Sequence, residues 1–284
     1  MADQTFSLTS RIQLNNGLSM PRLHLGVYLM SSSEASSAVK HALEAGYRAV
    51  DSAQMYRNEK QVGKSISEYL KAHPEVKRED IHYTTKLASN SDYSRARKSI
   101  SQSVKDCGLG YIDLFLLHSP YGGKQARLDS WRAVEDAIKD GEVKTGGVSN
   151  YGEKHIEELL ASNPKTKPAV NQIEVHPFNT RTNLTAYCQQ KGIVVEAYAP
   201  LARALRMKHP TIVSLAKKYK CTSGQLMVRW SLQHGYVPLP KSVRQERIVE
   251  NSHISQFAIS DDDVKAMDAL DEVLVTDWDP LDAD

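Results

Sequence analysis

The chain has 284 residues, and its 36 Lys and Arg residues against 34 Asp and Glu residues leave a formal net charge of +2. This length accommodates either one large α/β domain or two domains of ordinary size. The two charge signs are interspersed, which excludes a disordered chain and a polybasic nucleic-acid binder. We therefore expect no nucleic-acid partner.

The cysteines and the apolar runs exclude further classes of protein. Cys107, Cys188 and Cys221 lie far apart and form no C-x-x-C, which argues against a disulfide framework and a thiolate metal site. Residues 1–4 show no targeting signal, and apolar runs such as 193–195 are far shorter than the ~20 residues that span a bilayer. We expect a cytoplasmic monomer with no metal and no membrane partner.

Residues 11–20 alternate polar and apolar side chains around Asn16-Gly17, a dipeptide typical of a tight hairpin turn. An isolated hairpin is only marginally stable, so we expect it to pack on a larger body. Beyond it, short β-rich runs alternate with helical segments. The predicted strands are 22–28, 48–51, 82–86, 112–117, 143–148, 169–174, 193–198 and 236–239. The predicted helices are 34–45, 59–70, 94–107, 128–140, 153–160, 183–191, 210–219, 223–234 and 245–251.

Eight such units favour a (β/α)8 TIM barrel over a doubly wound sheet. Strands such as 112–117 are continuously apolar, as expected for parallel strands covered on both faces. The Gly-rich turn of many doubly wound folds is missing, because Asp113 stands where its third glycine belongs. No linker or repeat divides the chain. We expect one domain over 1–284, with the hairpin before the barrel and, after a helix at 261–270, a short, mobile acidic tail that carries Trp278.

Polar residues end three consecutive predicted strands, where TIM barrels place their active sites. These are Asp51, Lys86 and His118, and Tyr56 follows in the loop after Asp51. Neighbouring strands lie about 4.8 Å apart, so these side chains can meet. A nearby ammonium lowers the pKa of a phenol, and an imidazole can orient a carbonyl oxygen or share its proton. Each residue alone also fits an ordinary turn, surface or loop role, so the prediction depends on their joint placement.

The order and spacing of seven motifs resemble those of the aldo-keto reductases. The motifs are D-S-A-Q-M-Y-R-N-E at 51–59, T-T-K-L at 84–87, I-D-L-F-L-L-H-S-P at 112–120, G-V-S-N-Y at 147–151, N-Q-I-E-V-H-P at 171–177, Y-A-P-L at 198–201 and L-P-K-S-V-R-Q-E-R-I-V-E-N at 239–251. The resemblance implies a TIM barrel that reduces aldehydes and ketones with NADPH. It makes Tyr56 the general acid, Lys86 and Asp51 the pair that tunes it, and His118 the residue that orients the substrate carbonyl.

The same resemblance implies a cofactor site along the later strands. Ser149, Asn150 and Gln172 are expected to bind the nicotinamide carboxamide, and Tyr198 offers a ring on which the nicotinamide stacks. The remaining cofactor contacts that it implies are Leu201, Lys241, Ser242, Val243, Arg247, Glu250 and Asn251. The two cations favour NADP(H) over NAD(H), because a 2′-phosphate needs positive partners. Capping, core hydrogen bonding and surface pairing remain the plain alternatives for these residues.

Two positions depart from the family pattern and bear on the substrate. Tyr28 and Ser119 stand where many members carry tryptophan, and Ser119 should leave a wider, less apolar pocket wall. The connections 119–127 and 199–210 and the tail after residue 270 are short. We hypothesise an open pocket that takes small or medium carbonyl compounds.

Other chemistries find less support. The sequence has no H-E-x-x-H, no Walker A motif and no G-x-S-x-G, since residues 147–151 lack the final glycine. A regulatory subunit that binds the nicotinamide cofactor without catalysis is the main alternative. A Schiff-base isomerase or aldolase that uses Lys86 is a third, although a lysine paired with Asp51 would stay protonated and be a poor nucleophile.

Overall fold

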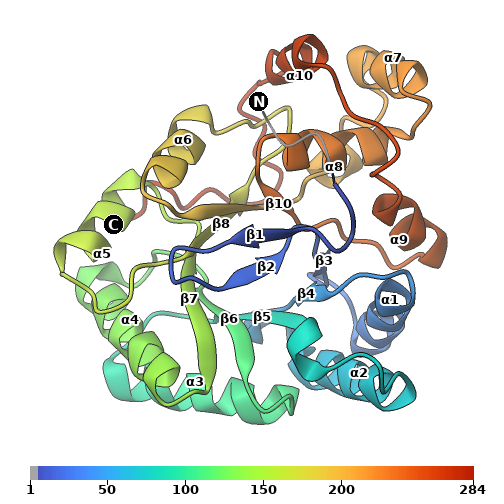
Figure 1. The fold of residues 1–284 in the computed structure, drawn as a ribbon. Helices are drawn as coiled ribbons and strands as arrows, with labels where there is room; N and C mark the ends of the chain where they lie inside the picture. The colour runs from blue at the N-terminus through green and yellow to red at the C-terminus, as the bar shows by residue number, and fades with distance from the viewer. Residues whose placement is uncertain (1–5) are drawn as a thin grey trace.

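The computed structural model describes residues 6–284, so the first residues, in which the sequence shows no targeting signal, lie outside the described part. A sheet of parallel strands curls around the centre of the molecule, and the helices lie outside it (Figure 1). In sheet order the strands are β3 (Leu25–Gly26), β4 (Ala49–Asp51), β5 (His82–Leu87), β6 (Ile112–Leu117), β7 (Val143–Ser149), β8 (Val170–Glu174), β9 (Val194–Tyr198) and β10 (Val237–Pro238). The predicted (β/α)8 fold is confirmed.

The first and last strands close the barrel through very short stretches. The His24 N–H donates to Pro238 O and the Gly26 N–H donates to Pro240 O, both at 3.2 Å. Both strands are shorter than predicted. At the start, the Arg22 N–H donates instead to Ser10 O, so this end of the predicted strand extends the hairpin.

The helices surround the sheet in chain order. Their bounds are α1 (Ser32–Glu44), α2 (Glu59–Ala72), α3 (Tyr93–Cys107), α4 (Gly123–Lys139), α5 (Glu153–Ala161), α6 (Thr182–Gln190), α7 (Pro210–Lys218), α8 (Ser223–Gln233), α9 (Gln245–Ser252) and α10 (Asp261–Asp268). Short 3-10 turns form η1 (Gln54–Tyr56), η2 (Arg78–Asp80) and η3 (Ala202–Ala204). Ser31 and Glu34 form a reciprocal capping box at α1, which satisfies free backbone N–H groups at the start of the helix. None of the described helices is long and apolar enough to cross a membrane.

The N-terminal hairpin covers one end of the barrel. Its strands β1 (Arg11–Gln13) and β2 (Ser19–Pro21) pair antiparallel, as predicted, and lie across the strand ends in Figure 1. Leu14 and Met20 of this hairpin join an apolar cluster with the barrel residues Leu114, Leu116 and Val237. Burial of these side chains holds the hairpin in place and keeps water out of this end.

The C-terminal tail, which was expected to be mobile, packs against the opposite end of the barrel. The Leu274 N–H donates to Phe178 O at 2.9 Å, and the Thr276 N–H donates to Glu174 Oε1 at 3.0 Å. The His155 Nε2 contacts Ala283 O at 2.6 Å. Acceptors at the ends of the strands satisfy the tail's backbone donors, so the tail forms part of the barrel mouth.

Candidate active site

The four residues predicted to transfer a proton meet at the carboxyl ends of β4, β5 and β6. Asp51 ends β4, Lys86 lies near the end of β5 and His118 directly follows β6. Tyr56 closes η1, the 3-10 turn after β4. Because the strands are parallel and adjacent, their ends lie side by side, as the sequence analysis expected.

Lys86 is the centre of this group. Its ammonium nitrogen lies 2.8 Å and 2.7 Å from the two carboxylate oxygens of Asp51, 2.8 Å from Ser52 O and 3.4 Å from the Tyr56 hydroxyl. The side chain is fully buried, at 0% exposure. A buried charge is tolerated only when it is paired and hydrogen-bonded, and Lys86 meets both conditions.

Tyr56 contributes a partly buried phenol to this group. Its ring lies 5.0 Å from the Tyr28 ring and 5.8 Å from the His118 ring, between centroids. Burial raises the pKa of Tyr56 well above 10, and the charge of Asp51 adds to the rise. The lowering of the Tyr56 pKa expected from Lys86 is not seen in this structure, where burial has the largest effect and raises the pKa. Tyr56 is therefore a neutral phenol and a proton donor at physiological pH.

His118 is a neutral imidazole in the same pocket. Burial lowers its pKa to about 3, and the Lys86 charge contributes in the same direction. Its Nδ1 forms no hydrogen bond with any residue from 6 to 284. A neutral ring offers one N–H donor and one acceptor, which suits the orientation of a carbonyl oxygen better than proton sharing.

The residues expected to bind a carboxamide form a connected network beside this group. The Ser149 hydroxyl donates to Gln172 O at 2.8 Å, and the Asn150 amide donates to His118 O at 3.1 Å. The Tyr198 hydroxyl donates to Asn150 Oδ1 at 2.9 Å, which holds the end of this side chain beside Asn150. Asn150 adopts the left-handed region, with φ of 59°, as the chain turns at the end of β7.

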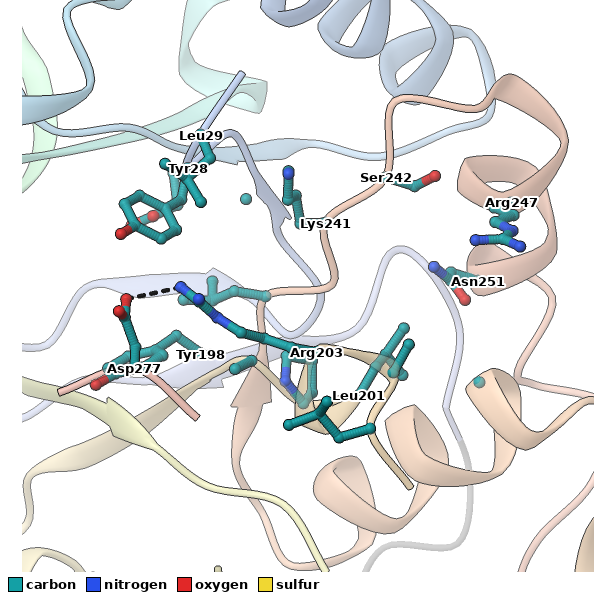
Figure 2. Close-up of a pocket in the computed structure, with 18 of the residues that line it drawn as sticks. Tyr28, Leu29, Tyr198, Leu201, Arg203, Lys241, Ser242, Arg247, Asn251 and Asp277 are labelled. Atoms are coloured by element: carbon teal, nitrogen blue, oxygen red, sulfur yellow. Dashed lines mark hydrogen bonds and ion pairs between the residues drawn. The ribbon is translucent and has the colours of Figure 1, made fainter. Parts of the chain in front are cut away.

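A single cavity of about 1390 Å3 joins the catalytic group to α9. Tyr56 and His118 line one end, and Arg247 and Asn251 line the other. In Figure 2, Tyr28 and Tyr198 lie at the first end, Ser242, Arg247 and Asn251 lie at the second, and Lys241 lies between them. The lining of the cavity runs from Asp51 of β4 to Asn251 of α9, so the cavity suits an extended ligand.

Most residues predicted for the site line this cavity. They are Tyr28, Asp51, Tyr56, His118, Ser149, Asn150, Gln172, Tyr198, Leu201, Lys241, Ser242, Arg247, Glu250 and Asn251. Lys86 lies below the cavity wall, where it holds Asp51. Ser119 and Val243 do not line it: the Ser119 carbonyl accepts a hydrogen bond from Asn90, and the Val243 side chain is exposed at the surface.

Three residues of the mouth were not predicted to form the site. Arg203 of η3 forms an ion pair with Asp277 of the tail at 2.7 Å, and the pair spans the cavity in Figure 2. The guanidinium also lies 5.5 Å from the centre of the Tyr28 ring. Trp278 packs edge-on against His118, with 6.0 Å between ring centroids. The short tail therefore supplies an aromatic wall, although Ser119 replaces the expected tryptophan.

The end of the cavity next to α9 includes the start of α8. Thr222, Ser223 and Gly224 line it, and a side chain added at Gly224 would contact Asn251 Oδ1 at 3.4 Å. Glu250 accepts a hydrogen bond from the Thr222 hydroxyl at 2.7 Å. The helix start and α9 thus form one wall. No cluster of three or more metal-ligating side chains occurs within residues 6–284.

Comparisons with known proteins show the family to which the chain belongs. The model of the Aldo/keto reductase family matches residues 23–272. An uncharacterised oxidoreductase of Schizosaccharomyces pombe is 45% identical and covers 96% of this chain and 98% of its own. Glyoxal reductase of Bacillus subtilis is 38% identical and covers 94% of each chain. The structure of the aldose reductase from Schistosoma japonicum matches with a TM-score of 0.86 and 33% identity, covering 93% of each chain.

Proposed function

The chain belongs to the aldo/keto reductase family, whose members are oxidoreductases that act on carbonyl compounds, and from this premise we propose that it is an NADPH-dependent reductase of aldehydes and ketones. The proposed substrates are small or medium carbonyl compounds. The proposed general acid is Tyr56, with Asp51 and Lys86 as the pair that tunes it and His118 as the residue that orients the substrate.

One observation carries the proposal: the Lys86 ammonium contacts both Asp51 and the Tyr56 hydroxyl. An ammonium 3.4 Å from the phenol oxygen stabilises the negative charge that develops there as the proton leaves. Asp51 keeps the ammonium charged and in place. A tyrosine with this support can protonate an alkoxide, which is the step that completes carbonyl reduction.

The side chains divide the chemistry among themselves. The neutral His118 donates a hydrogen bond to the carbonyl oxygen and aims it at the Tyr56 hydroxyl. A nicotinamide held in the cavity would supply the hydride for the carbonyl carbon. Tyr56 then gives its proton to the oxygen, while Trp278 and Tyr28 exclude water from the reacting group.

The cavity fits a phosphorylated dinucleotide. Lys241 and Arg247 are exposed cations, and neither forms an ion pair within the described residues. Such cations are suited to the 2′-phosphate that distinguishes NADPH from NADH. Tyr198 would support the nicotinamide, Ser149, Asn150 and Gln172 would hold its carboxamide, and Leu201, Ser242, Glu250 and Asn251 would line the rest of the dinucleotide. Val243 lies next to this wall but outside the cavity lining.

The alternatives fit the site less well. A Schiff base needs a neutral lysine with a free lone pair, whereas Lys86 donates to Asp51 and Ser52. A regulatory subunit without catalysis has no need for the buried Asp51–Lys86–Tyr56 arrangement. Borohydride trapping of substrate on Lys86 would support the Schiff-base alternative.

The test is NADPH oxidation over a panel of sugars, aliphatic aldehydes including glyoxal, aromatic aldehydes and α-keto esters. We expect turnover with several aldehydes, and Tyr56→Phe should lower kcat by about a hundredfold or more while NADPH affinity stays within about twofold. Tyr121→Phe, at the edge of the mouth, is the matched control. NADPH binding without turnover of any panel member, together with no effect of Tyr56→Phe, would replace the reductase with the regulatory subunit.

A further inference from the structure

Glu196 lies beneath the catalytic group, in the interior of the barrel, and has no role in the mechanism above. It belongs to β9, pairs in register with Gln172 of β8 and is completely buried. The Gln172 Nε2 donates to Asp51 Oδ1 at 2.8 Å and to Glu196 Oε2 at 2.6 Å. One amide group therefore joins the catalytic carboxylate to a second buried carboxyl group.

The charges around this second carboxyl group do not balance if it is ionised. Among the described residues, Lys86 is the cation in contact with this network, and it already binds both oxygens of Asp51. The other titratable groups that face Glu196 are His24, before β3, and beyond it His82 of β5, whose ring lies 5.3 Å from the His24 ring. Arg11 of the hairpin adds a more distant positive charge to both histidines.

The hydrogen bonds of His24 locate one further proton. The His24 Nε2 lies 3.0 Å from Pro21 O, and a carbonyl oxygen only accepts, so Nε2 carries a hydrogen. The opposite nitrogen, Nδ1, lies 3.4 Å from Glu196 Oε1, and neither of these buried atoms has a hydrogen-bond partner in the described chain. A bare lone pair facing a carboxylate would be repulsive, so a proton belongs between these two atoms.

Burial decides which atom carries that proton. It lowers the pKa of His24 well below 6.5, which keeps the imidazole neutral. Burial, together with the negative charge of Asp51, raises the pKa of Glu196 to about 8. The proton therefore resides on Glu196 at neutral pH, and the carboxylic acid faces the lone pair of His24 Nδ1.

We propose that Glu196 and His24 hold one proton between them beneath the catalytic pair, and that Glu196 is a positioning residue that tunes Tyr56 through Gln172 and Asp51. The effect on Tyr56 rests on the proposed reductase function, whereas the presence of the proton on Glu196 does not depend on that function. When Glu196 loses it, two carboxylates share one ammonium, the Asp51–Lys86 pair supports the Tyr56 phenolate less well, and proton delivery slows.

The proton is tested first without substrate. At pH 6.5 the native chain should show the infrared carbonyl stretch of a protonated carboxylic acid, and this band should disappear on titration to pH 9.5. Glu196→Gln should lack the band, since an amide keeps the shape and can donate to His24. Glu174→Gln, which replaces another buried carboxylate in the barrel, should keep it. A native spectrum without a band that titrates in this range would overturn the proposal.

The pH dependence of the free energy of unfolding provides a second test for the same proton. An acid whose pKa is raised on folding loses its contribution as pH rises toward the folded value, so the native chain should lose stability from pH 6.5 to 8. In Glu196→Gln this part of the pH slope should be missing, and in Glu174→Gln it should persist. Equal slopes in the native chain and Glu196→Gln would contradict the proposal even if the variant is less stable overall.

The link to Tyr56 is tested by the pH profile of kcat. The native enzyme should lose rate above about pH 8, and at pH 9 its kcat should be about tenfold below the plateau. In Glu196→Gln this limb should move to higher pH, so the ratio of kcat at pH 9 to kcat at pH 7 should rise about tenfold. An unchanged ratio would overturn the tuning role. Absence of any turnover in the native chain would instead reject the reductase function, and the infrared and stability results would still decide the proton.

Discussion

The two ends of the cavity are built in opposite ways. At the catalytic end, Lys86 is completely buried and its ammonium donates to both oxygens of Asp51. At the nucleotide end, Lys241 and Arg247 are exposed, and no ion pair forms on either within the described residues. A cationic side chain is thus fixed by an ion pair at one end, and cationic side chains are left unpaired at the other.

Under the proposed function, this difference separates the residues that act in the chemical step from those that bind the cofactor. A charge that is already paired and buried needs no rearrangement during the reaction, which is how preorganised groups stabilise a transition state. A solvated cation retains its pairing capacity for an incoming phosphate and steers it from solution. Changes at the catalytic end should therefore act on kcat, and changes at the nucleotide end should act on cofactor affinity.

The largest effect is expected from the removal of the buried ammonium. Lys86→Met should lower kcat by about a hundredfold or more, because the Tyr56 phenolate loses its cation and Asp51 becomes an unpaired buried charge. NADPH affinity, measured by fluorescence titration, should change by less than about threefold. Lys144→Met, on an exposed position of β7, is the matched control. A kcat within tenfold of the native value would refute the role of Lys86.

The next effect should appear in cofactor choice. Replacement of Lys241 and Arg247 by methionine, singly, should raise the KM for NADPH by about tenfold each, the value of one charge-assisted hydrogen bond. The KM for NADH and the kcat with saturating NADPH should stay nearly constant. Arg244→Met, an exposed neighbour that does not line the cavity, should have little effect. Parallel losses with NADH and NADPH would mean that these cations do not read the 2′-phosphate.

Residues that follow a strand were predictable from sequence, and residues of the mouth were not. Asp51, Lys86 and His118 end consecutive apolar runs, so the strand pattern alone brings them together. Trp278 and Arg203 lie in connecting segments whose path depends on tertiary hydrogen bonds, such as that from Leu274 N–H to Phe178 O. No periodicity encodes such a path.

The path of the tail, which the sequence pattern does not encode, also explains why the substrate hypothesis missed the aromatic wall. Ser119 indicated a wider pocket because the expected tryptophan was absent from that position. The tail places Trp278 against His118 instead, so the aromatic wall comes from a different part of the chain. The direction of the Tyr56 pKa shift could not be predicted from the sequence either, since it depends on burial and on the distance of Asp51 rather than on residue type.

A smaller effect is expected at this wall. Trp278→Ala should raise the KM for aromatic aldehydes about fivefold, because an aromatic contact contributes about 1 kcal/mol, and should change the KM for glyoxal by less than about twofold. Steady-state kinetics with matched aromatic and aliphatic aldehydes provide the measurement. Ser119→Trp should leave the ratio between the two classes nearly unchanged, since Ser119 does not line the cavity. The reverse result would restore Ser119 as the residue that sets substrate size.

The smallest effect is expected where the two ends meet, at the Arg203–Asp277 pair across the cavity. Both partners are about one-third exposed, so the pair itself contributes little to stability, about 0–1 kcal/mol. Its charges should still act on the proposed anionic cofactor. Asp277→Asn removes a negative charge from the cavity and should tighten NADPH binding about two- to threefold, whereas Arg203→Met should weaken it by a similar factor.

A second ion pair between the same segments provides the control. Arg206 Nε and Glu272 Oε1 lie 2.7 Å apart, with similar exposure, and neither residue lines the cavity. Glu272→Gln should therefore leave the Kd for NADPH unchanged. Salt should reduce the effects of Asp277→Asn and Arg203→Met, because exposed charges are screened within about 10 Å at 0.1 M ionic strength. Both substitutions could instead weaken NADPH binding equally and independently of salt. That result would mean that the ion pair acts by holding the tail in place, and that the position of the tail affects cofactor binding as well as the catalytic end.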